Sequence, residues 1–123
     1  MVIDSSVLLS IFFKEKHDSW ARGKLKEYRA SLKMSTVNLT EVLILVANKR
    51  PHLLQEIRDE IYASSIELMP PTVTQAEIAA NARVKYPLNL GDCFAYALAK
   101  SEGDSIITLD KDFLKTDLDV VFS

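Results

Sequence analysis

Short runs of apolar, often β-branched residues alternate with longer helical segments along the whole chain. Five runs are predicted as strands: Met1–Ile3, Ser31–Ser35, Ile66–Met69, Ser105–Thr108 and Asp119–Phe122. The first is continuously apolar, as expected for a strand that is buried on both faces. Strands that alternate with helices favour a parallel sheet. The sequence therefore predicts an α/β fold, with a mostly parallel sheet covered by helices on both faces.

Six helical segments separate these strands. They are Ser5–Phe13, Asp18–Tyr28, Leu39–Lys49, Pro51 to about Ala63, Thr74–Lys85 and Leu90–Ser101. The third segment is apolar on nearly every side, so we expect it to be buried. The 123 residues are 48% hydrophobic and contain no repeat or linker. A single domain spanning residues 1–123 is the expected organisation.

Composition excludes several functional classes. No apolar run approaches the roughly 20 residues of a membrane-spanning helix, and Met1–Asp4 does not resemble the start of a secretory signal. We therefore expect a cytoplasmic protein without membrane association. Cys93 is the only cysteine, which rules out an internal disulfide framework. The net charge of −2 is not that of a passive nucleic-acid binder, but it does not distinguish between classes of enzyme.

Four acidic residues occupy related places in this pattern. Asp4 and Asp110 follow predicted strands, whereas Glu41 and Asp92 are expected in the first turns of helices. Ligands of parallel sheets bind beyond the carboxyl ends of the strands. Two carboxylates about 4 Å apart repel by roughly 4 kcal/mol at an effective dielectric near 20, so a cluster needs protons or cations. Hard oxygen ligands favour Mg²⁺ or Mn²⁺, and neither His17 nor His52 is expected to be a ligand.

Each acid also has an ordinary structural interpretation. Asp4 could cap the helix that begins at Ser5, and Asn38 with Glu41 has the spacing of a capping box. Asp92 could complement the dipole of a helix capped by Asn89. Asp110 could cap a turn that starts at Lys111. The sequence leaves these interpretations open for single residues, and it is the joint placement of the four acids that favours a metal site.

Four segments resemble the acidic motifs of PIN-domain ribonucleases, and most closely those of VapC-type toxins from toxin–antitoxin pairs. These segments are Val2–Ser6, Leu39–Leu43, Leu88–Asp92 with the following Ala95–Ala99, and Ile107–Phe113. The resemblance follows the order of the family's motifs and covers essentially the whole chain. It implies a three-layer α/β/α sandwich and RNA cleavage that depends on one or two Mg²⁺ or Mn²⁺ ions.

The resemblance also assigns expected roles to residues. It implies that Asp4, Glu41, Asp92 and Asp110 are the catalytic metal ligands, with Ser6 and Thr108 as supporting hydroxyls. Asp112 is a candidate supporting acid, with a surface role as the alternative. From the residues themselves, candidates for RNA binding are Lys14, Lys16, Lys85, Lys111 and Lys115. Phe13 and Tyr86 are candidates for base stacking, with core packing the favoured interpretation of Phe13.

Partners are expected on the same grounds. The resemblance implies a small inhibitory antitoxin and a homodimer. The residues Ile11–Phe13, Trp20 and Tyr28 suggest an apolar groove that could hold a helix of the partner.

Three alternatives remain. The chain could be a PIN domain of RNA processing rather than a toxin, or a non-catalytic RNA- or protein-binding module of the same fold. A flavodoxin-like phosphoacceptor domain would also place an Mg²⁺-binding aspartate after a strand. Ser5 and Ser6 stand after Asp4, where that class would carry a second acid, which disfavours this alternative.

Overall fold

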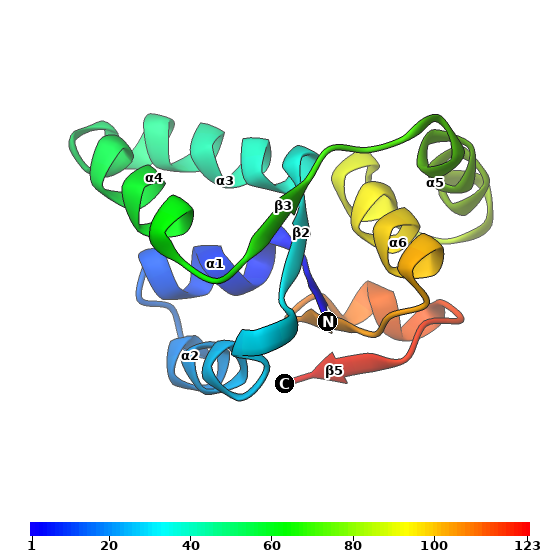
Figure 1. Cartoon of the computed structure of the whole chain (residues 1–123), viewed down its shortest axis with the longest axis horizontal. Coiled ribbons are helices and arrows are strands. Elements are labelled where there is room, and N and C mark those ends of the chain that lie inside the picture. The colour runs from blue at the N-terminus through cyan, green and yellow to red at the C-terminus, as the bar shows by residue number, and fades with distance from the viewer.

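The computed structural model describes all residues from 1 to 123 (Figure 1). Its five strands are β1 (Val2–Ile3), β2 (Lys33–Ser35), β3 (Glu67–Met69), β4 (Ile106–Thr108) and β5 (Val120–Phe122). Its α-helices are α1 (Ser5–Phe12), α2 (Asp18–Glu27), α3 (Thr36–Lys49), α4 (Leu54–Ala63), α5 (Val73–Lys85) and α6 (Leu90–Glu102). Short 3₁₀ turns occur at η1 (Arg29–Ser31), η2 (Pro51–Leu53) and η3 (Lys111–Lys115). Each predicted strand and helix is present.

The five strands form one sheet in the order β3-β2-β1-β4-β5. All four pairings are parallel, and Val2 of β1 lies opposite Lys33 on one side and Ile106 on the other. The predicted parallel sheet is therefore confirmed. Because β1 and β4 are neighbours that run in the same direction, the residues that follow them emerge at the same edge of the sheet.

Side chains alternate between the two faces of the sheet, as the two-residue period of a strand requires. Val2 and Ile106 pack into a core with α5 and α6, whereas Ile3 and Ile107 pack into a core with α1 to α4. Figure 1 shows these two groups of helices on opposite sides of the strands. This arrangement is a three-layer α/β/α sandwich. None of the helices is both long enough and apolar enough to span a lipid bilayer.

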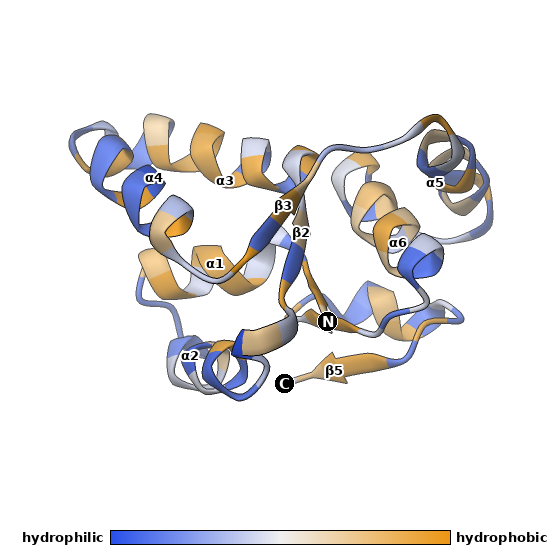
Figure 2. Cartoon of the chain, in the orientation of Figure 1, coloured by the Kyte–Doolittle hydropathy of each residue, from blue (hydrophilic) through white to orange (hydrophobic).

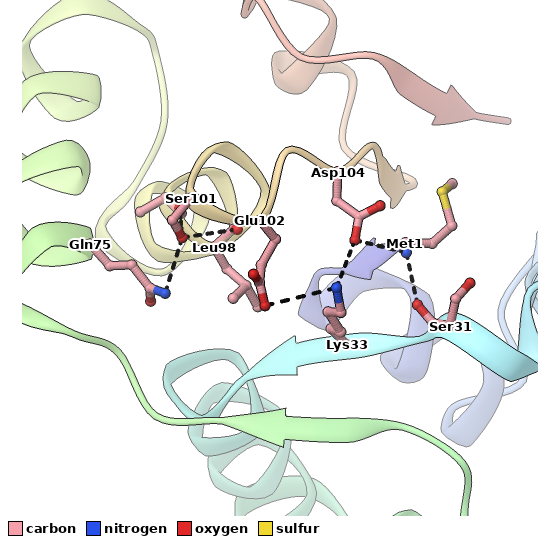
Figure 3. A network of polar contacts seen from close by, with 9 residues as sticks. Met1, Ser31, Lys33, Gln75, Leu98, Ser101, Glu102 and Asp104 are labelled. Carbon is pink, nitrogen blue, oxygen red and sulfur yellow. Dashed lines mark hydrogen bonds and ion pairs between the residues drawn. The ribbon is translucent and has the colours of Figure 1, made fainter.

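A polar network closes the amino ends of the strands (Figure 3). The Lys33 ammonium lies 3.2 Å from the Asp104 carboxylate and 3.8 Å from that of Glu102. The Met1 amino group contacts the same Asp104 carboxylate at 3.2 Å and donates a hydrogen bond to the carbonyl of Ser31. Charges of both signs therefore neutralise one another where β1, β2 and β4 begin.

Helix α3 differs from its prediction in two respects. It begins at Thr36, because the side chain of Ser35 accepts a hydrogen bond from the Val37 amide and caps the helix. Glu41 consequently lies in the second turn and not in the first. The helix is also not buried all round, since Ile44 is 54% exposed. Figure 2 shows how hydrophobic residues dominate α6, whereas hydrophobic and hydrophilic stretches alternate in α4.

Candidate active site

Asp4 lies between β1 and α1 and is almost completely buried, with 1% of its surface exposed. One carboxylate oxygen accepts a hydrogen bond of 2.6 Å from the Ser6 hydroxyl, and the other accepts one of 2.8 Å from the Thr108 hydroxyl. Asp4 occupies the N-cap position of α1, but its side chain accepts no hydrogen bond from the helix. The interpretation of Asp4 as a capping residue is therefore wrong, because its oxygens are engaged by the two hydroxyls.

Backbone amides fix the direction of these two hydroxyl groups. The Leu109 amide donates to Ser6 Oγ at 3.0 Å, and the Asp110 amide donates to Thr108 Oγ1 at 2.9 Å. Each hydroxyl has one proton, and with a donor already bound it directs that proton at Asp4. The segment that follows β4 therefore holds the buried carboxylate of β1 in a single orientation.

Asp110 and Asp92 combine local structural roles with their place at this edge. The Asp110 carboxylate accepts from the Asp112 amide at 2.9 Å and so caps the turn η3, as the structural interpretation predicted. The Asn89 side chain caps α6 by accepting from the Asp92 amide at 2.8 Å. The Asp92 carboxylate takes part in neither of these hydrogen bonds, and Asp92 is 7% exposed.

Glu41 reaches the site from α3. Its carboxylate accepts a hydrogen bond of 2.9 Å from the side-chain amide of Asn38, one turn earlier in the same helix. The predicted capping box is wrong, because Ser35 is the cap and Asn38 lies fully buried inside the first turn. Asn38 is therefore a neighbour of the site, although its spacing from Glu41 in the sequence is that of a capping residue.

The acids perturb one another electrostatically. Burial, with the nearby charges of Asp110, Asp4 and Glu41, raises the pKa of Asp92 to about 7. Burial also raises the pKa of Asp4 to about 6, and the charges of Asp110 and Glu41 act in the same direction, against the hydrogen bonds from Ser6 and Thr108. None of the four carboxylates takes part in an ion pair. The cluster therefore holds like charges without a cation of the protein to neutralise them.

These properties suit a hard divalent cation. No three acidic side chains are close enough together to form a ready-made metal cage. The available donors are carboxylate oxygens, which Mg²⁺ and Mn²⁺ prefer. A bound cation would reverse the raised pKa values of Asp4 and Asp92. The residues present fit such an ion chemically.

Comparison with known proteins places this arrangement in a family. The family model described as PIN domain matches residues 1–118. The chain belongs to the PIN-domain family. A protein of Mycolicibacterium smegmatis named Ribonuclease VapC is 30% identical over 130 residues, with 98% of this chain and 99% of that protein covered.

Solved structures agree with this fold. A toxin–antitoxin complex from Klebsiella pneumoniae superposes with a TM-score of 0.79 at 22% identity, covering 98% of this chain and 94% of that one. VapC20 of Mycobacterium tuberculosis, described as a toxin that cleaves the sarcin–ricin loop, has a TM-score of 0.82 at 14% identity, with 95% of each chain covered. The recognition of a VapC-like PIN domain from the sequence motifs is confirmed.

The remaining candidates are Asp112, the lysines and Phe13. The Asp112 carboxylate is 3.6 Å from the Lys115 ammonium. All five lysines named as RNA-binding candidates are exposed: Lys14, Lys16, Lys85, Lys111 and Lys115. Phe13 is instead half-buried beneath Lys49 and Arg50, at 5.6 Å and 6.0 Å from its ring centre.

A polar hollow of about 390 Å³ adjoins the acids on the α1 side. It is lined by Ser6, Leu9, Ser10, Glu15, Lys16, His17 and Leu109. The Ser6 hydroxyl thus contacts Asp4 and also borders this hollow. His17, which is not expected to be a ligand, lines the same hollow as Ser6 because the chain after α1 folds back. No local signal in the sequence reveals that return.

An apolar groove of about 360 Å³ lies on the same side of the sheet. Its lining comes mainly from α1, α2 and α4 and comprises Leu8, Ile11, Phe12, Arg22, Leu25, Glu60, Ile61, Ser64 and Ile66. The suggested groove near Ile11 is therefore present, but Trp20 and Tyr28 do not line it. They pack half-buried against the core.

Proposed function

We propose that this PIN domain is an endoribonuclease, dependent on Mg²⁺ or Mn²⁺, that hydrolyses RNA phosphodiester bonds as the toxin of a toxin–antitoxin pair. The carrying observation is the group of four uncompensated carboxylates at the carboxyl end of the sheet, two of which have strongly raised pKa values. The names of its relatives support ribonuclease activity, because the Mycolicibacterium smegmatis protein is a VapC ribonuclease that aligns along almost its whole length.

The acids would share the binding of one or two ions. Asp4 and Asp92 are the proposed central ligands, and Glu41 and Asp110 complete the site. When bound, the metal supplies hydroxide from coordinated water near neutral pH and neutralises charge that develops on the phosphate. The hydroxyls of Ser6 and Thr108 keep Asp4 ionised and correctly oriented, since both donate to its carboxylate. We assign Asp112 a supporting role, because its backbone amide donates a hydrogen bond to the Asp110 carboxylate.

RNA would reach the acids along the exposed lysines. Lys16 borders the polar hollow next to Ser6, and Lys111 directly follows Asp110. Positive side chains here would offset the repulsion between phosphates and the acidic cluster. Lys14, Lys85 and Lys115 are proposed for the outer part of the same path.

The proposed protein partner is an antitoxin bound in the apolar groove at Ile11, Phe12 and Leu25. The groove offers apolar side chains with Arg22 and Glu60 at its border, which suits an amphipathic helix. The solved toxin–antitoxin complex from Klebsiella pneumoniae, which shares this fold, supports an antitoxin as partner. We also propose a cytoplasmic homodimer, in keeping with the resemblance to VapC-type toxins.

The decisive experiment compares the purified protein with Asp4→Asn on a pool of structured RNAs, in EDTA, Mg²⁺ or Mn²⁺. Asn fills the same space. Its Oδ1 can accept from one of the two hydroxyls and its Nδ2 can donate to the oxygen of the other, so the variant should fold and lose metal-dependent cleavage. Asp59→Asn, at an exposed position on α4, is the matched control and should cleave normally.

Cleavage in EDTA, or normal cleavage by folded Asp4→Asn, would contradict the proposal. RNA binding without any gain in cleavage on adding Mn²⁺ would instead favour the non-catalytic module.

A further inference from the structure

Gly91 and Asn38 bring Glu41 of α3 and Asp92 of α6 together, although they lie far apart in sequence. The side-chain amide of Asn38 donates to the Glu41 carboxylate at 2.9 Å and to the Gly91 carbonyl at 3.0 Å. One buried nitrogen thus joins an acid of α3 to the residue immediately before an acid of α6.

Gly91 provides the space that the Glu41 carboxylate occupies. A Cβ placed on Gly91 would lie within 2.5 Å of the carboxylate carbon and both oxygens of Glu41. Real Cβ atoms essentially never come within 3.0 Å of another heavy atom, so the Glu41 carboxylate would have to move. The backbone gives no other reason for glycine, because only Gly103 has a positive φ among the glycines. Alanine would otherwise be favoured over glycine in a helix.

The orientation of the Asn38 amide serves Glu41 and not the general stability of the core. Its nitrogen has two acceptors, whereas its buried Oδ1 has no hydrogen-bond partner. Leaving a buried carbonyl oxygen unpaired is unfavourable. The opposite orientation would direct that oxygen at the Glu41 carboxylate and would remove the donor, so the arrangement is the one that holds the acid in place.

We propose that Gly91 and Asn38 are positioning residues that seat the Glu41 carboxylate against the start of α6, Gly91 by lacking a side chain and Asn38 by donating a hydrogen bond. This inference rests on the proposed metal-dependent function, in which Glu41 is a ligand. As a consequence, the metal site depends on Gly91, a residue without a side chain that could itself bind metal.

Gly91→Ala should displace the Glu41 carboxylate without preventing the protein from folding. The neighbouring atoms are the end of a flexible side chain, so the protein should fold while the Glu41 carboxylate is displaced. Mn²⁺ affinity should fall about 10–100-fold, as is typical when support of a metal ligand is lost, and cleavage should recover partly at high Mn²⁺. Gly23→Ala is the matched control, because Gly23 lies in α2 with nothing near its added Cβ.

A double-mutant cycle distinguishes positioning from a general packing effect. In a Glu41→Ala background, Gly91→Ala should change Mn²⁺ affinity less than about twofold, since the carboxylate that it displaces is absent. An equal loss in both backgrounds would overturn the proposal. Asn38→Asp, which puts a second carboxylate against Glu41, should weaken Mn²⁺ binding in the same way as Gly91→Ala.

A measurement on the metal-free protein keeps the two proposals distinguishable. The side-chain NH₂ resonances of Asn38, identified by their loss in Asn38→Asp, should shift in Gly91→Ala and remain in place in Gly23→Ala. Unchanged resonances in Gly91→Ala would overturn the seating proposal. Shifted resonances in a protein that binds no Mn²⁺ would support the seating and contradict the proposed function.

Discussion

The two ends of the parallel sheet treat charge in opposite ways. At the amino ends of the strands, Lys33 and the Met1 amino group surround Asp104. Burial alone would raise the pKa of Asp104, but the hydrogen bonds from Lys33 and Met1 lower it. At the carboxyl ends, burial and neighbouring acids raise the pKa of Asp4 and of Asp92, and no cation is paired with either.

This difference separates a stabilising use of charge from a costly one. An acid whose pKa is lowered in the folded protein contributes to stability at neutral pH, and an acid whose pKa is raised reduces it. Clusters of the second kind are retained in proteins mainly where they serve a function. Binding of a ligand of opposite charge relieves the repulsion between such acids. The carboxyl end of the sheet is therefore linked to function and the amino end to folding.

The largest effect expected from this comparison is that two Asp→Asn variants, one at each end of the sheet, change cleavage and stability in opposite ways. Asp92→Asn should reduce cleavage about a thousandfold, given the several kcal/mol that metal ions supply to transition states. Without metal, the same variant should be more stable by about 1–2 kcal/mol, as is common when a strained active site is relaxed. Asp104→Asn should do the reverse, with normal cleavage and a lower Tm.

Cleavage assays and thermal melts in EDTA measure both responses. A metal-free Asp92→Asn protein that melts below the wild type would show that the carboxyl end of the sheet is not electrostatically strained.

Removing one hydroxyl from the carboxyl end should have the next largest effect. Thr108→Val keeps the shape of the side chain but leaves one oxygen of Asp4 without its donor. We expect Mn²⁺ affinity, measured by calorimetry, to fall about 10–100-fold, the usual range for groups that orient a metal ligand. Thr116→Val also removes a threonine hydroxyl with local hydrogen bonds, but away from Asp4, and should leave the affinity unchanged. Equal losses in both variants would contradict a specific role for Thr108.

Much of this contrast could be predicted from the sequence, because it depends on local position. Asp4 and Asp110 follow short apolar strands, and parallel strands bring such residues to one edge. The supporting hydroxyls, Ser6 and Thr108, came only from the resemblance to PIN-domain motifs.

Other features depend on contacts that no short window of sequence contains. Asn38 and Gly91 are 53 positions apart and meet only because α3 packs against the start of α6. His17 borders the hollow at Ser6 because the loop after α1 turns back. The turn that contains Glu41 was misplaced because Ser35, and not Asn38, caps α3.

The stability of the metal-free protein should depend on pH in a direction set by the carboxyl end. Asp4 and Asp92 have folded pKa values of about 6 and 7, above the value of 3.8 for an unperturbed aspartate. The folded state therefore binds more protons than the unfolded state between pH 4 and 7, and stability falls as pH rises through this window. We expect Tm in EDTA to drop by a few degrees between pH 5.5 and 8, equivalent to about 1–2 kcal/mol.

Two further melts isolate the cause of this pH dependence. Asp92→Asn should flatten the curve, and Mg²⁺ should raise Tm more at pH 8 than at pH 5.5. A Tm that rises steadily from pH 5.5 to 8 in EDTA would mean that other groups control stability in this range. The acids Asp104 and Asp117 do not compete in this window, because their pKa values are lowered and their contribution is lost only in more acidic solution.

The smallest expected effect is at the amino end. Lys33→Met removes contacts to Asp104 and Glu102 and should cost about 0.5–1 kcal/mol, because partly exposed ion pairs contribute little individually. Lys24→Met, which breaks a single pair with Glu27 within α2, should cost less in the same denaturant titration. Neither substitution should alter cleavage or Mn²⁺ affinity. If Lys33→Met weakened Mn²⁺ binding, the charges of the two ends would be coupled through the short strands, and the division into a folding end and a functional end would no longer hold.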